Sequence, residues 1–305
     1  GVGDIKISRF WFLLLLVLAL FILFCFFGYF VFKGVDFSES KKIGTSKNKD
    51  AEIALVKVEG IIMDAETTIE LLQKAEMNKK FKAIILRIDS PGGAVGPSQE
   101  IYQEIERINK VKPIYASMGT VAASGGYYIA SATRKLFANP GTLTGSIGVI
   151  MNFMNLSEIY QWLKIKPQTI KAGNYKDIGS SSREMSEEEL KILNEMLADV
   201  HEQFMEDILK YRQKKLQKDI REIAQGQIYS GREALKIGLV DELAGLWRAK
   251  RRIAKELKIS EDTNFEEMEE DPDNKIWKYF EKIQENTSQL TRLMNSHNKP
   301  MMVNE

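Results

Sequence analysis

The sequence predicts an α/β protein in which a mostly parallel sheet is covered by helices. Two observations support this prediction. Short apolar runs alternate with amphipathic segments from about residue 51, and two glycine-rich motifs directly follow two of the predicted strands. Repeated strand–helix units favour right-handed crossovers and buried parallel strands. Ligands of such folds bind beyond the carboxyl ends of the strands, which is where both motifs fall.

Composition excludes several function classes. The chain has 305 residues and a net charge of +1, so it carries no broad basic footprint for nucleic acid. Its one cysteine, Cys25, can form no disulfide within the chain, and with only two histidines, His201 and His297, a zinc site is not favoured. A serine hydrolase with this composition is expected to use a base other than histidine. We expect no cofactor and no metal.

The N-terminal region predicts a membrane anchor. Residues 10–32 contain no charged side chain, and a helix of this length spans about 30–35 Å, enough to cross a bilayer. A cleavable signal peptide is the alternative, but the run is long for one and no small-residue cleavage motif follows it. We therefore expect an anchor in residues 1–32 and a polar linker at 33–50.

The elements of a domain at 51–260 follow in order. Apolar runs predict strands at 53–58, 83–88, 113–118 and 135–138. Helical periodicity predicts helices at 67–77, 97–108, from 124 onward, 156–164, 185–218 and 246–257. The polar segment at 180–184 is expected to be mobile. The segment at 229–241 predicts a capped helix and a short strand. We expect a helical extension at 261–305.

The central motif is the stretch Gly119–Ala130, which contains Ser124. A serine at a strand-to-helix corner lies near free backbone N–H groups, and the small residues around it leave room for a substrate backbone. The stretch therefore suits a nucleophile. The alternative is that Ser124 only caps the helix and that the glycines after it form a tight turn.

Three further motifs carry candidate groups. Asp89–Gly93 predicts a turn whose backbone N–H groups could form an oxyanion hole, a phosphate nest or an ordinary strand-to-helix connection. The uncharged stretch at 142–150 contains Ser146, which is either a turn residue or a hydrogen-bond partner of a catalytic group. The stretch at 171–179 contains Lys176 after an expected strand, where most lysines are only solvated surface residues.

Together these motifs resemble one family, the bacterial signal peptide peptidase A family (peptidase family S49). The resemblance covers about residues 53–260 and the N-terminal anchor. It rests on four motifs in the same order, Ser90–Gly93, Gly119–Tyr128, Thr144–Gly148 and Gly173–Asp177. One set of motifs indicates the short, single-repeat form. The resemblance implies a ClpP/crotonase-like fold and a serine endopeptidase that needs no cofactor.

The resemblance also assigns roles to residues. It implies that Ser124 is the nucleophile and Lys176 the general base. The backbone N–H groups of Gly92 or Gly93 and of Gly125 would form the oxyanion hole, and Ser146 would orient the lysine.

Substrate and location follow from the same resemblance. The implied function is degradation of signal peptides left after preprotein cleavage. The implied protein is a ring-shaped, octamer-like homo-oligomer whose site is shared between neighbouring subunits. It would be held by one span in the bacterial cytoplasmic membrane, with the catalytic domain on the extracytoplasmic side. A crotonase-like acyl-CoA enzyme and a non-catalytic membrane ring scaffold are the alternatives.

This chemistry makes a physical demand on the lysine. Lys176 must be neutral before it can accept a proton from Ser124, and exclusion of water disfavours the charged ammonium form. Assembly of subunits around the site would supply that exclusion.

Overall fold

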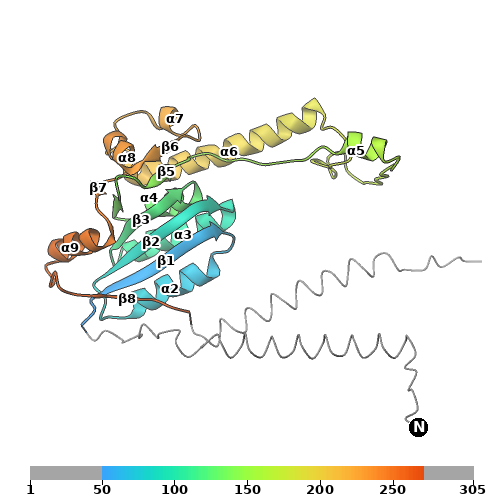
Figure 1. Cartoon of the computed structure of the whole chain (residues 1–305). Helices are drawn as coiled ribbons and strands as arrows, with labels where there is room; N and C mark the ends of the chain where they lie inside the picture. The colour runs from blue at the N-terminus through green and yellow to red at the C-terminus, as the bar shows by residue number, and fades with distance from the viewer. Residues whose placement is uncertain (1–49, 271–305) are drawn as a thin grey trace, which may run out of the picture. The chain divides into compact units, whose positions relative to one another are not determined.

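A computed structural model describes residues 50–270 of the chain (Figure 1). The anchor predicted at residues 10–32 and the last helix of the predicted extension lie outside this range. Within residues 50–270 no helix is both long and apolar enough to cross a membrane. The described part is an α/β domain, which confirms the predicted fold class.

A single sheet of eight strands organises this domain. Its strand order is β6-β5-β3-β2-β1-β8, with β4 pairing with β3 and β7 off this path. All pairs are parallel except β5 with β6. The strands are β1 (Ile53–Ile62), β2 (Ala83–Gly93), β3 (Ile114–Ala123), β4 (Lys135–Ala138), β5 (Leu143–Gly145), β6 (Ile228–Ser230), β7 (Glu242–Leu243) and β8 (Phe265–Glu267).

The third strand has two partners on the same side. Residues 115–117 of β3 pair with β4, whereas residues 121–123 pair with β5. The carboxyl end of β3 thus continues beyond β4, with β5 on one side and the end of β2 on the other. This is the part of the sheet from which Ser124 emerges.

Helices cover both faces of the sheet. The alternation of side chains along β1 places Ala54 and Val56 in one apolar core and Ile53 and Leu55 in the other. Helices α2, α3, α4 and α6 contribute to the first core, and α9 packs against the second. The helices are α2 (Glu66–Met77), α3 (Val95–Asn109), α4 (Gly125–Ser131), α5 (Ser157–Trp162), α6 (Glu187–Arg212), α7 (Ile220–Ile223), α8 (Gly231–Ile237) and α9 (Leu246–Leu257).

Several sequence expectations are wrong in detail. The turn expected at Asp89–Gly93 is instead the end of β2, because residues 92 and 93 still pair with β1. The extension expected to be helical from residue 261 contains β8, which pairs with β1. No strand lies between β5 and Lys171, so Lys176 lies in a turn that follows α5 and irregular chain.

Helix α6 is buried along only part of its length. Phe204, Met205 and Ile208, in its C-terminal half, pack into the first core. Leu190 and Met196, in its N-terminal half, are instead more than 40% exposed. In Figure 1 this half extends away from the sheet, and α5 lies near its far end. We call residues 150–199 the arm.

Candidate active site

Ser124 lies at the corner between β3 and α4, at the N-cap position of the helix. Its backbone has φ 52° and ψ −123°, a conformation that is strained for any residue with a Cβ atom. Its side chain makes no capping hydrogen bond to the helix, so the alternative role as a helix cap is not what the geometry shows. Strain at a strand-to-helix corner is typical of a nucleophile that must be exposed above a sheet.

Two glycines of β2 lie directly against this corner. A methyl group added to Gly92 would lie 2.7 Å from the nitrogen of Gly125 and 2.8 Å from Cβ of Ser124. One added to Gly93 would lie 2.0 Å from the carbonyl oxygen of Ile62. Neither position has room for a side chain. The backbone of β2 lies close to the Ser124–Gly125 corner at Gly92 and close to Ile62 of β1 at Gly93.

The N–H groups of Gly93 and Gly125 are suited to hold an oxyanion. Ala94 donates its N–H to Ile62 O at 2.7 Å, and in a parallel ladder the N–H of the preceding residue, Gly93, then points away from β1 toward β3. The N–H of Gly125 begins α4 and has no acceptor within the helix. The N–H of Gly92, in contrast, donates to Ser90 Oγ at 3.1 Å. Of the three glycines expected to form the oxyanion hole, Gly93 and Gly125 therefore fit best.

Ser146 lies beside the nucleophile. Ser124 donates its N–H to Gly145 O at 2.8 Å, and Ser146 donates its own N–H to Gln227 O at 2.7 Å. Ser146 has φ 50°, a second positive value at a non-glycine residue. The structure thus brings Ser124, the two glycines and Ser146 together from three neighbouring strand ends.

A hollow adjoins Ser124. Its walls come from α3, α4, α6 and the segment after β5. Its lining is mostly apolar: Gly93, Val95, Ser98, Gln99, Ser124, Gly125, Tyr128, Gly148, Val149, Val200 and Phe204. Val200 and Phe204 belong to α6, whose apolar residues predict only a packed helix face. Only the tertiary structure shows that these two residues reach the site.

Lys176 is not near Ser124 in this chain. It is exposed, lies outside the hollow, and belongs to a turn that is tied to Glu189 in the first turn of α6. Val200, which lines the hollow, follows Glu189 by eleven residues, or about 16 Å along a helix. That distance is much longer than a lysine side chain. Within one chain, therefore, the structure does not bring the two residues of the expected dyad together.

Histidine offers no evident alternative base. His201, on α6, is not among the residues that line the hollow. Its Nε2 atom is buried and has no hydrogen-bond partner within the described residues. His297 lies outside the part of the chain that the structure describes. In residues 50–270 no group of three or more histidine, cysteine, aspartate or glutamate residues could hold a metal ion.

Comparison with known proteins identifies the family. The model of peptidase family S49 matches residues 106–260, half of the chain, and the Clp protease model matches residues 46–143. The chain belongs to peptidase family S49. It is a serine-type peptidase, and its α/β sheet fits a ClpP-like fold.

Individual relatives agree with this assignment. A protein of Synechocystis provisionally named as a protease is 40% identical over 63% of this chain and 69% of its own length. A protein of Enterococcus faecium provisionally named signal peptide peptidase SppA is 34% identical over 75% of this chain and 69% of its own. The chloroplastic serine protease SPPA of Arabidopsis thaliana is 37% identical over 62% of this chain and 28% of its own.

Proposed function

We propose that this S49 peptidase uses Ser124 as its nucleophile and Lys176 of a neighbouring copy as its general base. The observation that carries the proposal is the strained Ser124, which lies beside two suitably placed backbone N–H groups and an apolar hollow. Neutral Lys176 takes the proton of the Ser124 hydroxyl, whose oxygen then attacks the scissile carbonyl carbon. The N–H groups of Gly93 and Gly125 stabilise the resulting oxyanion.

The second half of the reaction reverses these roles. Lys176 gives its proton to the leaving amine, and the C–N bond breaks to leave an ester on Ser124. Water then attacks the ester carbonyl carbon, and the lysine accepts a proton from the water. The ester C–O bond breaks, the lysine returns that proton to the Ser124 oxygen, and the acid product leaves. Ser146 orients the lysine amine. The dyad requires no metal and no cofactor.

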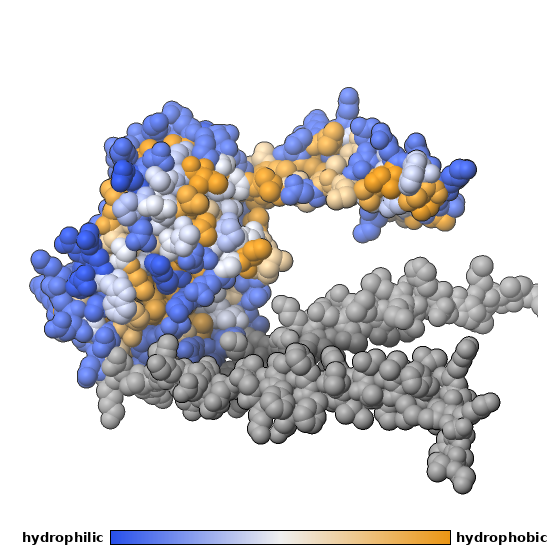
Figure 2. Space-filling model, viewed as in Figure 1, coloured by the Kyte–Doolittle hydropathy of each residue, from blue (hydrophilic) through white to orange (hydrophobic). Residues whose placement is uncertain are grey.

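Supply of the lysine by a second copy explains the surface of the arm. Figure 2 shows apolar surface gathered over its outer end. Twelve large apolar side chains of the arm are at least 37% exposed: Ile150, Met151, Phe153, Met154, Ile159, Trp162, Leu163, Ile165, Ile170, Leu190, Ile192 and Met196. Exposed apolar area of this extent indicates a protein interface. Packing of the arm against a neighbour would bury it and exclude water from Lys176, within a closed, octamer-like ring.

The substrate class follows from the hollow and from the N-terminal run. The hollow accepts an apolar side chain next to the cleaved bond, and an uncharged run at residues 10–32 would hold the domain at a membrane. Released signal peptides are apolar and remain in that membrane. We therefore propose that the enzyme degrades them on the extracytoplasmic side of the bacterial cytoplasmic membrane. Family membership sets aside the acyl-CoA alternative.

Cleavage of a fluorogenic signal-peptide-like substrate tests the dyad. We would compare the full chain with Ser124→Ala, Lys176→Ala and Lys171→Ala variants that keep the wild-type assembly mass. The proposal predicts loss of activity by orders of magnitude for the first two only. Full activity of Lys176→Ala would contradict the assigned base. An assembled wild-type protein that cleaves no peptide would favour the scaffold alternative.

A further inference from the structure

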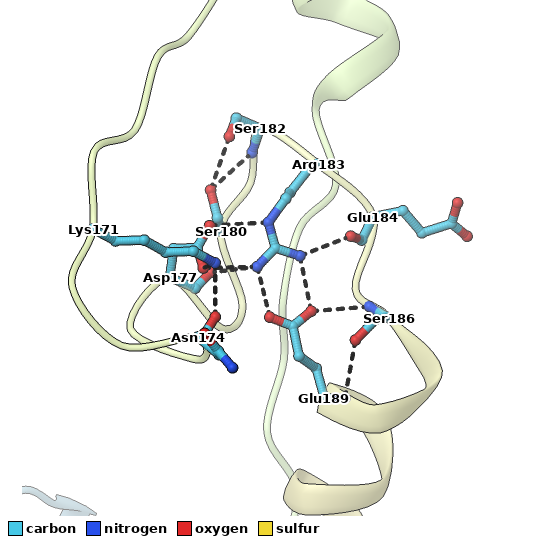
Figure 3. Close-up of polar contacts among 9 residues, drawn as sticks. All are labelled: Lys171, Asn174, Asp177, Ser180, Ser182, Arg183, Glu184, Ser186 and Glu189. Atoms are coloured by element: carbon cyan, nitrogen blue, oxygen red, sulfur yellow. Dashed lines mark hydrogen bonds and ion pairs between the residues drawn. The ribbon is translucent and has the colours of Figure 1, made fainter.

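A polar network holds the turn that carries Lys176. Figure 3 shows Arg183 between two carboxylates, that of Asp177 in the turn and that of Glu189 in α6. Arg183 donates to Asp177 from Nε at 3.0 Å and from Nη2 at 2.9 Å. It also donates to Glu189 from Nη1 at 2.8 Å and from Nη2 at 2.6 Å. The segment 180–184, expected to be mobile, therefore contains the residue that joins the turn to the helix.

The helix end of this network is itself fixed. Glu189 is buried, and its Oε2 atom accepts the backbone N–H of Ser186 at 2.9 Å. Ser186 Oγ in turn accepts the N–H of Glu189 at 3.2 Å, which completes a capping box at the start of α6. The hydrogen bonds from Arg183, and then the one from Ser186, lower the pKa of Glu189 to about 2. Asp177 is thus tied through Arg183 to an ionised carboxylate in a 26-residue helix.

The same network distinguishes the two lysines of the turn. Lys171 donates from Nζ to Asn174 O at 2.7 Å and pairs with Asp177. Both contacts hold the Lys171 amine within its own turn. The side chain of Lys176, next to Asp177 in sequence, makes no hydrogen bond or ion pair within residues 50–270. Its amine remains available for a partner outside the chain.

We infer that Arg183 is a positioning residue for the general base, a role that rests on the proposed Ser124–Lys176 dyad. Arg183 touches neither substrate nor nucleophile. Through Asp177 it fixes the backbone of the Lys176 turn against α6, so that the amine reaches the nucleophile in the assembled enzyme. Its planar guanidinium bridges both carboxylates, which a lysine ammonium cannot do with the same geometry.

The test compares Arg183→Gln and Arg183→Lys in the full chain. Misplacement of the base by about 1 Å is expected to lower kcat about 10- to 100-fold and to leave KM within about threefold. Arg183→Lys should recover part of that loss. The rate at which a fluorophosphonate labels Ser124 should fall with kcat, since it also depends on the base. Asp177→Asn, which keeps the side-chain shape, should show the same pattern, and it provides a second route if Arg183→Gln does not assemble.

Arg107→Gln is the matched control. Arg107 also bridges two carboxylates, Glu104 and Glu76, but it lies on α3 twelve residues after Val95, away from the hollow. This variant should keep wild-type kcat. A loss in Arg107→Gln equal to that in Arg183→Gln would assign the effect to general destabilisation and overturn the inference.

A double variant separates this inference from the proposed function. If Arg183 acts through Lys176, Arg183→Gln should add no further loss in a Lys176→Ala background. An inactive Lys176→Ala protein together with wild-type kcat in Arg183→Gln and Asp177→Asn would overturn the inference alone. An active Lys176→Ala protein would overturn the dyad and, with it, the role of Arg183.

Discussion

The backbone N–H of Ser124 donates a 2.8 Å hydrogen bond to the carbonyl oxygen of Gly145. This bond joins the end of β3 to β5 just before both chains turn sharply. The serine that directly follows each strand has a positive φ. The value is 52° at Ser124, after β3, and 50° at Ser146, after β5. The sheet thus places two serines with positive φ at the ends of neighbouring strands.

The backbone strain at Ser124 should appear as a difference in unfolding free energy between two variants. Ser124→Ala keeps a Cβ atom at φ 52°, whereas Ser124→Gly removes the clash that makes this conformation costly. We expect the glycine variant to be more stable than the alanine variant by about 1 kcal/mol, after allowance for the flexibility of glycine in the unfolded chain. Both should be inactive. Chemical denaturation of the two proteins gives the difference.

Ser131, in helix α4, provides the control for this comparison. At an ordinary helical position the order should reverse, with alanine more stable than glycine by about 0.5–1 kcal/mol. If Ser124→Gly were instead less stable than Ser124→Ala, the strain at this corner would not be real.

The hollow should set the preference for the side chain beside the cleaved bond. Val95 lines it and is 40% exposed, so Val95→Phe would narrow it without opening the core. We expect kcat/KM for a peptide with leucine at this position to fall about tenfold relative to one with alanine. Parallel assays of the two peptides measure the ratio. Val111→Phe, on an exposed loop, should leave it unchanged, and an unchanged ratio in Val95→Phe would place the side chain elsewhere.

A buried ion pair should stabilise the C-terminal end of α6. Arg212 is 1% exposed and donates to Asp241 Oδ2 at 2.7 Å and to Gly238 O at 2.6 Å. Burial raises the pKa of Asp241, but the charge of Arg212 and the hydrogen bonds to this carboxylate outweigh it and hold the pKa below its usual value. Arg212→Met removes the buried partner and leaves Asp241, among the described residues, with only the more exposed Lys215 as an ion-pair partner, 2.8 Å away. The substitution should therefore cost about 3 kcal/mol of unfolding free energy, the low end of the range for breaking a buried pair.

The exposed pair of Arg221 and Glu202 is the comparison for this buried pair. Arg221→Met should cost less than about 1 kcal/mol, because water screens a surface pair. Denaturation midpoints of the two variants measure the two losses of unfolding free energy. Equal losses would show that burial does not strengthen the pair at Arg212.

Acid should loosen the Lys176 turn before the sheet unfolds. The folded pKa of Glu189, about 2, lies below its ordinary value of 4.5, so its stabilising contribution is present above about pH 4.5 and is lost as the pH falls toward 2. Amide hydrogen exchange in residues 171–190, corrected for intrinsic rates, should therefore rise between pH 5 and pH 3. In the Glu189→Gln variant, the same amides should exchange faster already at pH 5. An acid response unchanged by this substitution would assign it to another group.

The sequence predicted the fold class and most elements because each depends on local patterns. Apolar runs located β1 and β3, and small residues marked the corner at Ser124. What it could not show depends on contacts between distant segments. The pairing of β8 with β1 was missed because a strand of three residues is too short to show an alternation of apolar and polar side chains. The position of Phe204 in the wall of the hollow depends on how α6 packs across the domain.

The arm illustrates the same limit differently. The apolar residues in the first half of α6 predict a buried face, yet Leu190 and Met196 are exposed in the single chain. Their pattern is consistent with burial by a second copy, which a one-chain structure does not contain. Arg183 was missed because a polar segment between two predicted helices gives no sign of which carboxylates it will bridge.

Co-assembly of two inactive variants tests the central claim most directly. Ser124→Ala and Lys176→Ala chains would be co-expressed with different tags, purified through both tags, and assayed on the fluorogenic peptide. If each site combines Ser124 of one subunit with Lys176 of its neighbour, random mixing restores both groups in about a quarter of the sites, and activity should return to about that fraction of wild type. Mixed assemblies no more active than either variant alone would show that the two residues must belong to one chain.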